Sequence, residues 1–262
     1  MKTNYKIITV LLIIFSVLTV NSIQSTNEPL SIVGSTSIQP VCEQLAEEYK
    51  KTHDNVDINI QGGGSSLGIK CAKSDVADIG MSSKEIDCEN LEEHEIGREA
   101  IIVIVNNENP INDLSTKHLQ KIFSGEIKNW RELTNISGEI NVIIREEGSG
   151  TLDSFKSTVM KNQSFKKDAI IQNSAGSVKQ SVIQDRNAIG FVSLAHLDDS
   201  IKNISIDKVS PSKESVIEGT YKLQRPFILL SDKNCDNKAK EFINWTMSEE
   251  SDSVLDKEKI IR

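Results

Sequence analysis

The stretch LSIVGSTSIQPVCEQLAEEYKK, residues 30 to 51, joins a short apolar segment to an amphipathic one through a turn of small residues. LSIVG (30–34) is typical of a buried strand, and the segment 41–51 has the apolar spacing of a helix. The residues at that spacing are Val41, Leu45, Ala46 and Tyr49. Pro40 stands near the predicted helix start, where its missing N–H costs no hydrogen bond. The stretch therefore predicts a strand–turn–helix unit.

The same alternation continues along the chain. A helix is predicted at 67–73, after the turn GGGSS. Further strands are predicted at 56–61, 77–82, 99–107, 140–145, 188–193 and 225–231. We find no internal repeat and no low-complexity linker. The pattern predicts an α/β fold, with helices on the faces of a sheet.

The N-terminal residues 1–24 have the pattern of an export signal. Lys2 and Lys6 flank the start, an apolar run follows from Ile7 to Val20, and small residues follow that run. The run is short for a membrane helix, which favours a cleaved signal peptide over an uncleaved anchor. No cysteine follows the run closely enough to carry a lipid. We therefore expect an exported, periplasmic protein.

Length and charge limit what the exported part can do. A chain of 262 residues with 37% hydrophobic residues can bury a large core, in one domain or two lobes. Loss of the two N-terminal lysines changes the formal net charge from −8 to −10. Nucleic acid and anionic membrane are poor partners for such a surface.

The cysteines leave two interpretations open. Four cysteines without CxxC spacing allow three pairings in an oxidising compartment, so one or two disulfides are compatible with the sequence. Buried free thiols are equally compatible, because thiols bury readily. The residues concerned are Cys42, Cys71, Cys88 and Cys235.

Three turns combine glycine with a hydroxyl residue at a predicted helix start. They are GSTS (34–37), GGGSS (62–66) and GSGT (148–151). Glycine lets backbone approach a ligand closely, and the free N–H groups of a helix start favour an anion. Each turn alone is typical of an ordinary helix cap. Three such turns on one chain favour an oxyanion site.

Arg145 strengthens this interpretation, because it stands directly before the third turn, in REEGSGT (145–151). Its planar guanidinium can bind two oxygens of a tetrahedral anion. We expect Glu147 to orient that guanidinium through a salt bridge. A further turn, Gly176-Ser177, either caps a fourth helix or adds a backbone donor.

The histidines point away from metal chemistry. They lie far apart, without the spacing of metal ligands, and we interpret all four as surface residues. They are His53, His94, His118 and His196. No metal and no cofactor are expected.

Five motifs resemble the phosphate-binding proteins of the bacterial phosphate ABC transporter. They are GSTSIQP (34–40), QGGGSSLGI (61–69), DIGMSSKEI (78–86), KIFSGEIKNW (121–130) and REEGSGT (145–151). The resemblance runs in order over nearly the whole exported chain. It implies a two-lobed periplasmic-binding-protein fold of type II, each lobe a mixed sheet flanked by helices.

The resemblance also implies how the chain is divided. Lobe I would comprise 25–103 and 222–262, and lobe II would comprise 104–221. The chain would cross between lobes near 102–106 and return near 221–227, and the two hinge crossings would let the lobes close on inorganic phosphate. The expected protein is a monomer that delivers phosphate to membrane permease subunits and is not an enzyme.

The family's ligand contacts can be carried over residue by residue. The implied phosphate ligands are Ser35, Thr36, Ser37, Ser65, Ser83, Arg145, Ser149, Gly150 and Thr151, with Gly64, Glu147 and Gly148 in support. Some members have an aspartate where this chain has Ser83. A hydroxyl can still accept the proton of a protonated phosphate, but rejection of sulfate is less assured.

Two alternatives remain from the residues. A receptor for sulfate or another tetrahedral oxyanion would use the same turns. An exported serine hydrolase would need a general base near Ser65 or Ser149, and the sequence shows neither a GxSxG elbow nor a nearby histidine.

Overall fold

The computed structural model describes residues 28–54, 56–86, 88–161 and 163–262, so the predicted signal segment 1–24 lies outside the described residues. The strands are β1 Leu30–Gly34, β2 Ile58–Gly62, β3 Ile79–Ser82, β4 Leu91–Val105, β5 Asp113–Leu114, β6 Asn141–Arg145, β7 Ile170–Gln172, β8 Ala188–Ser193, β9 Lys202–Ile206 and β10 Gln224–Asp232. The α-helices are α2 Gln39–Tyr49, α3 Ser65–Lys73, α4 Thr116–Ser124, α5 Gly150–Phe155, α6 Ala175–Gln184, α7 Lys213–Ile217, α8 Asn237–Met247 and α9 Asp252–Lys257. Short 3₁₀ or π turns are at Trp130–Glu132, Lys156–Met160, Leu194–His196 and Glu249–Ser251.

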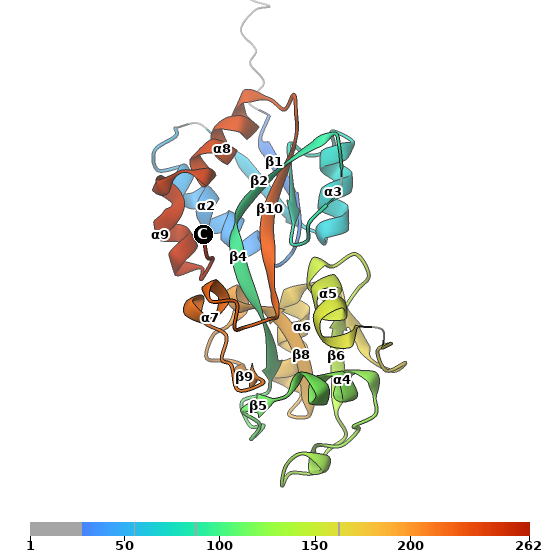
Figure 1. Ribbon diagram of the computed structural model, residues 1–262. Coiled ribbons are helices and arrows are strands. Elements are labelled where there is room, and N and C mark those ends of the chain that lie inside the picture. The colour runs from blue at the N-terminus through green and yellow to red at the C-terminus, as the bar shows by residue number, and fades with distance from the viewer. Residues whose placement is uncertain (1–27, 55, 87, 162) are drawn as a thin grey trace, which may run out of the picture.

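The long strand β4 connects two groups of strands. The pairing order is β2-β1-β3-β10-β4-β8-β6-β7, with β9 beside β4 and β5 beside β9. Residues 91–100 of β4 pair with β10, whereas residues 101–105 pair with β8. We call the group on the β10 side lobe I and the group on the β8 side lobe II. Figure 1 shows the lobes one above the other, with β4 running through both.

The predicted lobe boundaries lie close to this change of partner. β4 changes partner between Ala100 and Ile101, and the pairing of β10 with β4 begins at Gln224. The predicted boundaries are at 103/104 and 221/222, within three residues of those positions. The division of the chain at those residues remains a prediction.

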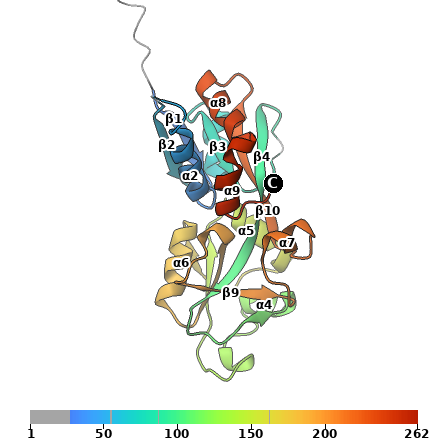
Figure 2. The same ribbon diagram turned by 90° about the vertical axis from the view of Figure 1, so that its left-hand side faces the viewer.

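The central strands of the lobe I sheet are buried on both faces. Along β10, Phe227 and Leu229 pack with the cluster that includes helices α2, α8 and α9, whereas Ile228 and Leu230 pack on the opposite face with Ala72 of α3. Successive side chains of a strand point to opposite faces, so a run of apolar residues needs cover on both sides. Figure 1 shows α3 on one side of this sheet and the other three helices across from it, and Figure 2 shows those three helices in front of the sheet.

Lobe II is built around a second apolar cluster that collects side chains from β4, β6, β8 and their helices. Phe155 stacks on Phe191 with ring centroids 4.0 Å apart. Trp130 is fully buried, and its indole N–H donates to the Asn187 carbonyl at 3.0 Å. Each lobe therefore has its own apolar core, and a site can lie where the two lobes meet.

The predicted α/β fold is confirmed, and each of the seven predicted strands corresponds to a strand of the structure. The main difference is β4, which begins at Leu91 instead of residue 99. The added part, LEEHEIGR, is mostly charged, and it pairs with β10 while exposing those side chains to solvent. Three short strands, β5, β7 and β9, were not predicted.

The structure decides between the two interpretations of the cysteines, because all four thiols are free and no disulfide joins them. Only Cys42 is buried, and burial raises its pKa to about 12. In the part of the chain that the structure describes, no helix has both the length and the apolar character to span a membrane.

Candidate functional site

The first predicted turn brings two buried hydroxyls to the carboxyl end of β1. Gly34 has a φ of +145°, and a Cβ there would lie 2.3 Å from the Met81 carbonyl oxygen of β3. That close packing requires glycine. The Ser35 amide donates to the same carbonyl at 3.0 Å. Ser35 and Ser37 are 3% and 0% exposed, so their hydroxyls face the interior of the molecule.

The second turn meets the first through Ser83. Ser65 opens α3, and its Oγ accepts from the Ser83 amide at 3.1 Å. The Ser83 Oγ lies 3.1 Å from the Oγ of Ser65 and 3.1 Å from the Oγ of Ser35. Parallel strands bring their carboxyl ends to one edge of a sheet, and β1, β2 and β3 pair in parallel. Three segments of lobe I therefore contribute hydroxyls to one point.

The third turn supplies hydroxyls from lobe II. Gly148 has a φ of +92°, and the Ser149 hydroxyl caps α5 by accepting from the Leu152 amide at 3.4 Å. The Thr151 Oγ1 lies 3.1 Å from the Ser37 Oγ of lobe I. A Cβ on Gly150 would lie 2.5 Å from the Ser83 Oγ, so this helix start packs directly against lobe I.

Further polar contacts hold the lobes together around this cluster. The Ser66 amide donates to the Gly148 carbonyl at 3.1 Å. The Lys84 ammonium lies 2.8 Å from the Asp153 carboxylate. The structure therefore has the two lobes in contact at the predicted site.

The fourth helix start also contacts lobe I. α6 is capped by Ser174, whose hydroxyl accepts from the Ser177 amide at 3.0 Å. The Ala175 amide donates to the Thr36 hydroxyl at 3.2 Å. The predicted turn Gly176-Ser177 itself lies inside α6, because the cap is Ser174 and the backbone donor to lobe I is Ala175.

Arg145 is 2% exposed at the end of β6. Its Nε and Nη2 donate to the two oxygens of Glu146, both at 2.8 Å. The predicted salt bridge to Glu147 is wrong. The Glu146 amide still donates to the Gln172 carbonyl of β7, so Glu146 continues the strand pairing of β6. The Glu147 side chain, by contrast, is 81% exposed and binds Lys156 at 2.6 Å.

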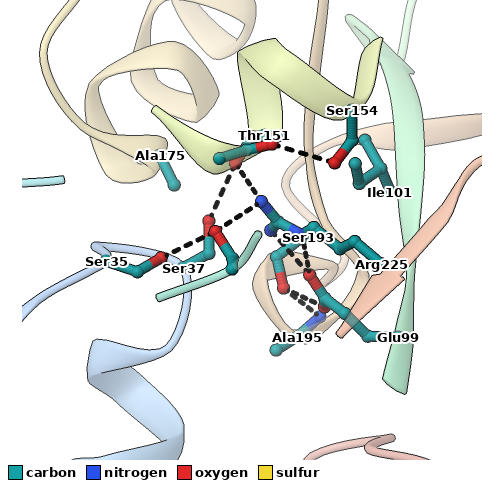
Figure 3. Close-up of polar contacts among 12 residues, drawn as sticks. Ser35, Ser37, Glu99, Ile101, Thr151, Ser154, Ala175, Ser193, Ala195 and Arg225 are labelled. Carbon is teal, nitrogen blue, oxygen red and sulfur yellow. Dashed lines mark hydrogen bonds and ion pairs between the residues drawn. The ribbon is translucent and has the colours of Figure 1, made fainter. Parts of the chain in front are cut away.

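A second buried guanidinium, Arg225, was not predicted. Arg225 of β10 pairs across the sheet with Glu99 of β4, and both side chains are buried. One Glu99 oxygen accepts from Arg225 Nε at 3.0 Å and from Nη2 at 2.7 Å. Arg225 Nη1 donates to the Ser83 hydroxyl at 3.0 Å and also to the Thr151 hydroxyl. Figure 3 shows Arg225 between Glu99 and Thr151.

Glu99 is held by more than Arg225. Its second oxygen accepts a hydrogen bond from the Ser193 hydroxyl of β8, and the carboxylate also accepts from the Ala195 amide (Figure 3). Burial raises the pKa of Glu99, and the charge of Arg225 opposes that shift. Burial likewise lowers the pKa of Arg225, which Glu99 opposes. Buried charges of this kind persist where they are paired and hydrogen-bonded.

The prediction that all four histidines lie at the surface is confirmed for His118, whereas the other three are half-buried. His53 stacks on Tyr49 with ring centroids 3.8 Å apart, and His94 bonds the Ser231 hydroxyl at 3.1 Å. His196 has a buried Nδ1 without a hydrogen-bond partner among the described residues. Burial, followed by the charge of Arg225, lowers the pKa of His196 to about 4. Only His118 is exposed.

The structure therefore brings most predicted site residues to one place. Five hydroxyls, from Ser35, Ser37, Ser65, Ser83 and Thr151, form one hydrogen-bonded group with Arg225. Gly64, Gly148 and Gly150 allow the close packing around it. Arg145 is near enough for its charge to affect the pKa of Arg225. Glu147 is solvent-exposed and binds Lys156 instead.

Hydroxyls and guanidinium groups are the donors that an oxyanion needs. In the described ranges, no group of three or more His, Cys, Asp or Glu side chains could hold a metal ion. No histidine among the described residues hydrogen-bonds to Ser65 or Ser149, whose hydroxyls contact Ser83 and the Leu152 amide. The arrangement is suited to an anion that binds between the two α/β lobes.

Comparison with known proteins agrees with that class. The family model of the PBP superfamily domain matches residues 19–250. The phosphate-binding protein PstS of Bacillus subtilis is 30% identical over 228 residues, covering 84% of this chain and 76% of that protein. The PstS of Borreliella burgdorferi is 26% identical and covers 97% of both chains. The chain belongs to the PBP superfamily and, within it, to the family of the phosphate-binding proteins PstS.

Solved structures have the same architecture. A phosphate ABC transporter substrate-binding protein from Clostridium perfringens, solved with bound phosphate, has a TM-score of 0.86 and 36% identity. The match covers 90% of this chain and 99% of that chain. An ABC-type phosphate transport receptor from Vibrio cholerae has a TM-score of 0.71 and 32% identity over 89% of this chain and 99% of that chain.

Proposed function

We propose that this protein captures inorganic phosphate between its two lobes and delivers it to the permease of an ABC importer. The observation that carries the proposal is the convergence of five hydroxyls from both lobes on the buried guanidinium of Arg225, with Arg145 nearby. Such a site offers many donors and two positive charges to a tetrahedral anion. The Clostridium perfringens relative, solved with bound phosphate, supports the choice of ligand.

Within this proposal the ligand contacts are the predicted ones, with one replacement. The proposed contacts are Ser35, Thr36, Ser37, Ser65, Ser83, Arg145, Ser149, Gly150 and Thr151. Glu146 takes over the orienting role that was predicted for Glu147, because it is the carboxylate that binds the Arg145 guanidinium.

The lobes would act as a hinged pair. Residues 25–103 and 222–262 form the proposed lobe I, and residues 104–221 form lobe II. The change of strand partner within β4 supports this division. We further propose that the protein is a monomer, is exported by its N-terminal segment 1–24, and acts in the periplasm without catalysing a reaction.

Calorimetry of the exported chain with phosphate, sulfate and arsenate tests the proposal. Phosphate should bind with a stoichiometry of one, after removal of any phosphate carried through purification. Failure to bind phosphate would refute the proposal. A chromogenic phosphate ester tests the hydrolase alternative. A binding protein leaves the ester intact, whereas a serine hydrolase would cleave it, and the variant Ser149→Ala would then have lost that activity.

A receptor for sulfate is the second candidate, and one observation favours keeping it. Position 83 carries a hydroxyl that can donate to a fully ionised anion, where some family members have an aspartate. The same calorimetric series compares the two anions directly.

A further inference from the structure

Arg225 makes contacts that fix the direction of other hydrogen bonds in the site. It stands opposite Glu99 in the register of β10 and β4, one residue before β4 changes partner from lobe I to lobe II. Glu99 takes up the Nε and Nη2 edge of the guanidinium, so Nη1 is left to contact the site. The orientation of Arg225 is therefore fixed by Glu99 of β4, which is itself held by Ser193 of β8.

Nη1 donates to one hydroxyl of each lobe. Its partners are Ser83, which follows β3 in lobe I, and Thr151 in α5 of lobe II. A guanidinium has donors only, so both hydroxyls must act as acceptors toward it. Each hydroxyl has two lone pairs and one proton, which leaves each with one lone pair and its proton.

The remaining capacity of Ser83 is limited. Its Oγ lies 3.1 Å from both Ser35 and Ser65, so the last lone pair and the proton already have partners. Accepting the proton of a protonated phosphate would require one of those hydroxyls to turn away. Donating to an anion likewise takes the Ser83 proton away from one of those hydroxyls. Arg225, however, occupies one of the two lone pairs of Ser83 and leaves its proton, so this contact lowers the capacity of Ser83 to accept and favours a ligand that presents acceptors.

The charged groups around Arg225 favour the same ligand. Glu99 on β4 occupies one edge of Arg225, and the Arg145 charge on β6 acts on it from lobe II. His196 also feels the Arg225 charge, and its pKa of about 4 keeps it neutral near neutral pH. Glu146 occupies the Nε and Nη2 edge of Arg145. No hydrogen bond joins a carboxylate of the described residues to any of the five hydroxyls. The Glu146 carboxylate, whose Oε1 would lie 3.2 Å from a Cβ on Gly64, is instead held by Arg145.

We propose that Arg225, positioned by Glu99, makes this site select the fully ionised form of a tetrahedral oxyanion. Phosphate then enters as the dianion, and sulfate is accepted beside it. Arg225 acts here as a positioning residue that turns the protons of Ser83 and Thr151 toward the ligand. This inference rests on the proposed capture of phosphate.

The wild-type protein gives the first test, by calorimetry with phosphate and with sulfate between about pH 5 and pH 8. Below the second ionisation of phosphate, the dianion fraction and hence the apparent phosphate affinity should fall about tenfold per pH unit. Sulfate does not titrate in this range, so its affinity should stay constant. Sulfate should bind within about a hundredfold of phosphate at the upper end, since the site lacks an acceptor that would reject it.

The outcomes separate this inference from the proposed function. Phosphate binding that is independent of pH, or strong rejection of sulfate, would overturn the inference and leave phosphate capture standing. A sulfate affinity that falls in parallel with that of phosphate would trace the pH effect to the protein, for example to Glu99, and would also overturn it. Absence of phosphate binding at every pH would overturn both.

Variants test whether Arg225 is responsible. Arg225→Gln alone would leave Glu99 buried without its partner, so the double variant Glu99→Gln with Arg225→Gln keeps the pair neutral. Its phosphate affinity should fall, and the pH slope of phosphate binding should flatten, because Ser83 regains a free lone pair. A weaker affinity with the wild-type slope and the wild-type ratio of phosphate to sulfate would show a merely structural role. Arg98→Gln, at a half-exposed arginine paired with Glu95, is the control and should change neither quantity.

Ser83→Asp keeps the inference testable if the double variant does not fold. A carboxylate at this position can accept from Arg225 and from a phosphate proton together. Sulfate affinity should then fall at least about tenfold more than phosphate affinity near pH 6, because two acceptors would face each other. Phosphate binding should also weaken more steeply at high pH, where the dianion dominates. A ratio of phosphate to sulfate unchanged from the wild type would overturn the inference.

Discussion

At the scale of single residues, the two arginines of the site differ in how they can be found. Arg145 is visible in the sequence, because it stands directly before a turn of Gly-Ser-Gly-Thr. Arg225 begins an apolar strand, RPFILLS, with no glycine turn beside it. Its partner Glu99 is 126 residues away and is brought opposite by the register of two antiparallel strands. Local spacing therefore reveals the first arginine and cannot reveal the second.

Replacement of Arg145 tests its role as a ligand. We expect Arg145→Ala to weaken phosphate binding at least tenfold, because loss of a buried charge-assisted contact costs about 2 to 5 kcal/mol. Calorimetry with phosphate measures the change. Arg186→Ala is the matched control, since Arg186 also lies in lobe II but its side chain is 64% exposed and lies 4.0 Å from Glu108. An unchanged affinity in Arg145→Ala would remove this residue from the site.

His196 should make the folded state sensitive to acid. Its pKa is lowered from 6.5 to about 4 in the folded protein, chiefly by burial. A depressed folded pKa means that the unfolded chain binds the proton more readily, so stability present above pH 6.5 is lost as the pH falls toward 4. The loss from this group is at most about 3 kcal/mol.

Urea unfolding at neutral pH and near pH 4.5 measures that loss. The difference in unfolding free energy between the two pH values should be smaller in His196→Gln than in the wild type. His118→Gln, at an exposed histidine, should behave like the wild type. An equal acid sensitivity in all three proteins would show that His196 does not contribute.

At the scale of elements, the start of α5 packs tightly against the opposite lobe. A Cβ on Gly150 would lie 2.5 Å from the Ser83 Oγ and 2.7 Å from the Ser83 carbonyl oxygen. The start of α6 is more open, since the nearest atom to a Cβ on Gly176 is the Ser174 Oγ at 3.9 Å. The two helix starts therefore form a matched pair for substitution.

Gly150→Ala should hinder closure without unfolding either lobe. The added methyl group meets backbone of the other lobe, and a small separation of the lobes relieves that contact. Phosphate affinity should fall at least tenfold, which corresponds to about 1.4 kcal/mol, while the melting temperature of the unliganded protein stays near the wild-type value. Gly176→Ala should keep the wild-type affinity. Equal affinities in the two variants would contradict this account of the α5 start.

At the scale of the whole molecule, two separate cores are connected through β4 and β10. Polar contacts join the facing edges of the lobes, among them Lys84 with Asp153 and the Ser66 amide with the Gly148 carbonyl. Polar contacts of this kind exchange with water at modest cost. Such contacts are compatible with the proposed opening and closing of the lobes around the site.

Closure should be visible in solution. The radius of gyration from small-angle scattering should be smaller with phosphate than without it, because the ligand favours the closed arrangement. The protein must first be stripped of phosphate by unfolding and refolding. The ligand should also stabilise the folded state by about 2.7 kcal/mol at a concentration of one hundred times its dissociation constant. Stabilisation without a change in radius would contradict the hinge while leaving the binding in place.

The sequence by itself determined the α/β class, the positions of the strands whose side chains are mostly apolar, and the three turns that carry hydroxyls. These features are local, because strand and helix periodicity and glycine turns are written in neighbouring residues. The charged first half of β4 was not predicted from the sequence. A strand that pairs at one side of a sheet can expose most of its side chains, and it then lacks the apolar pattern of a buried strand.

Only the tertiary structure decided which side chains meet. It paired Arg145 with Glu146 in place of Glu147, because the backbone of Glu146 continues the β6–β7 pairing. It also placed Arg225 and Glu99 at the point where β4 passes from one lobe to the other. Contacts between segments far apart in the chain depend on sheet register and lobe packing, and no local pattern contains either.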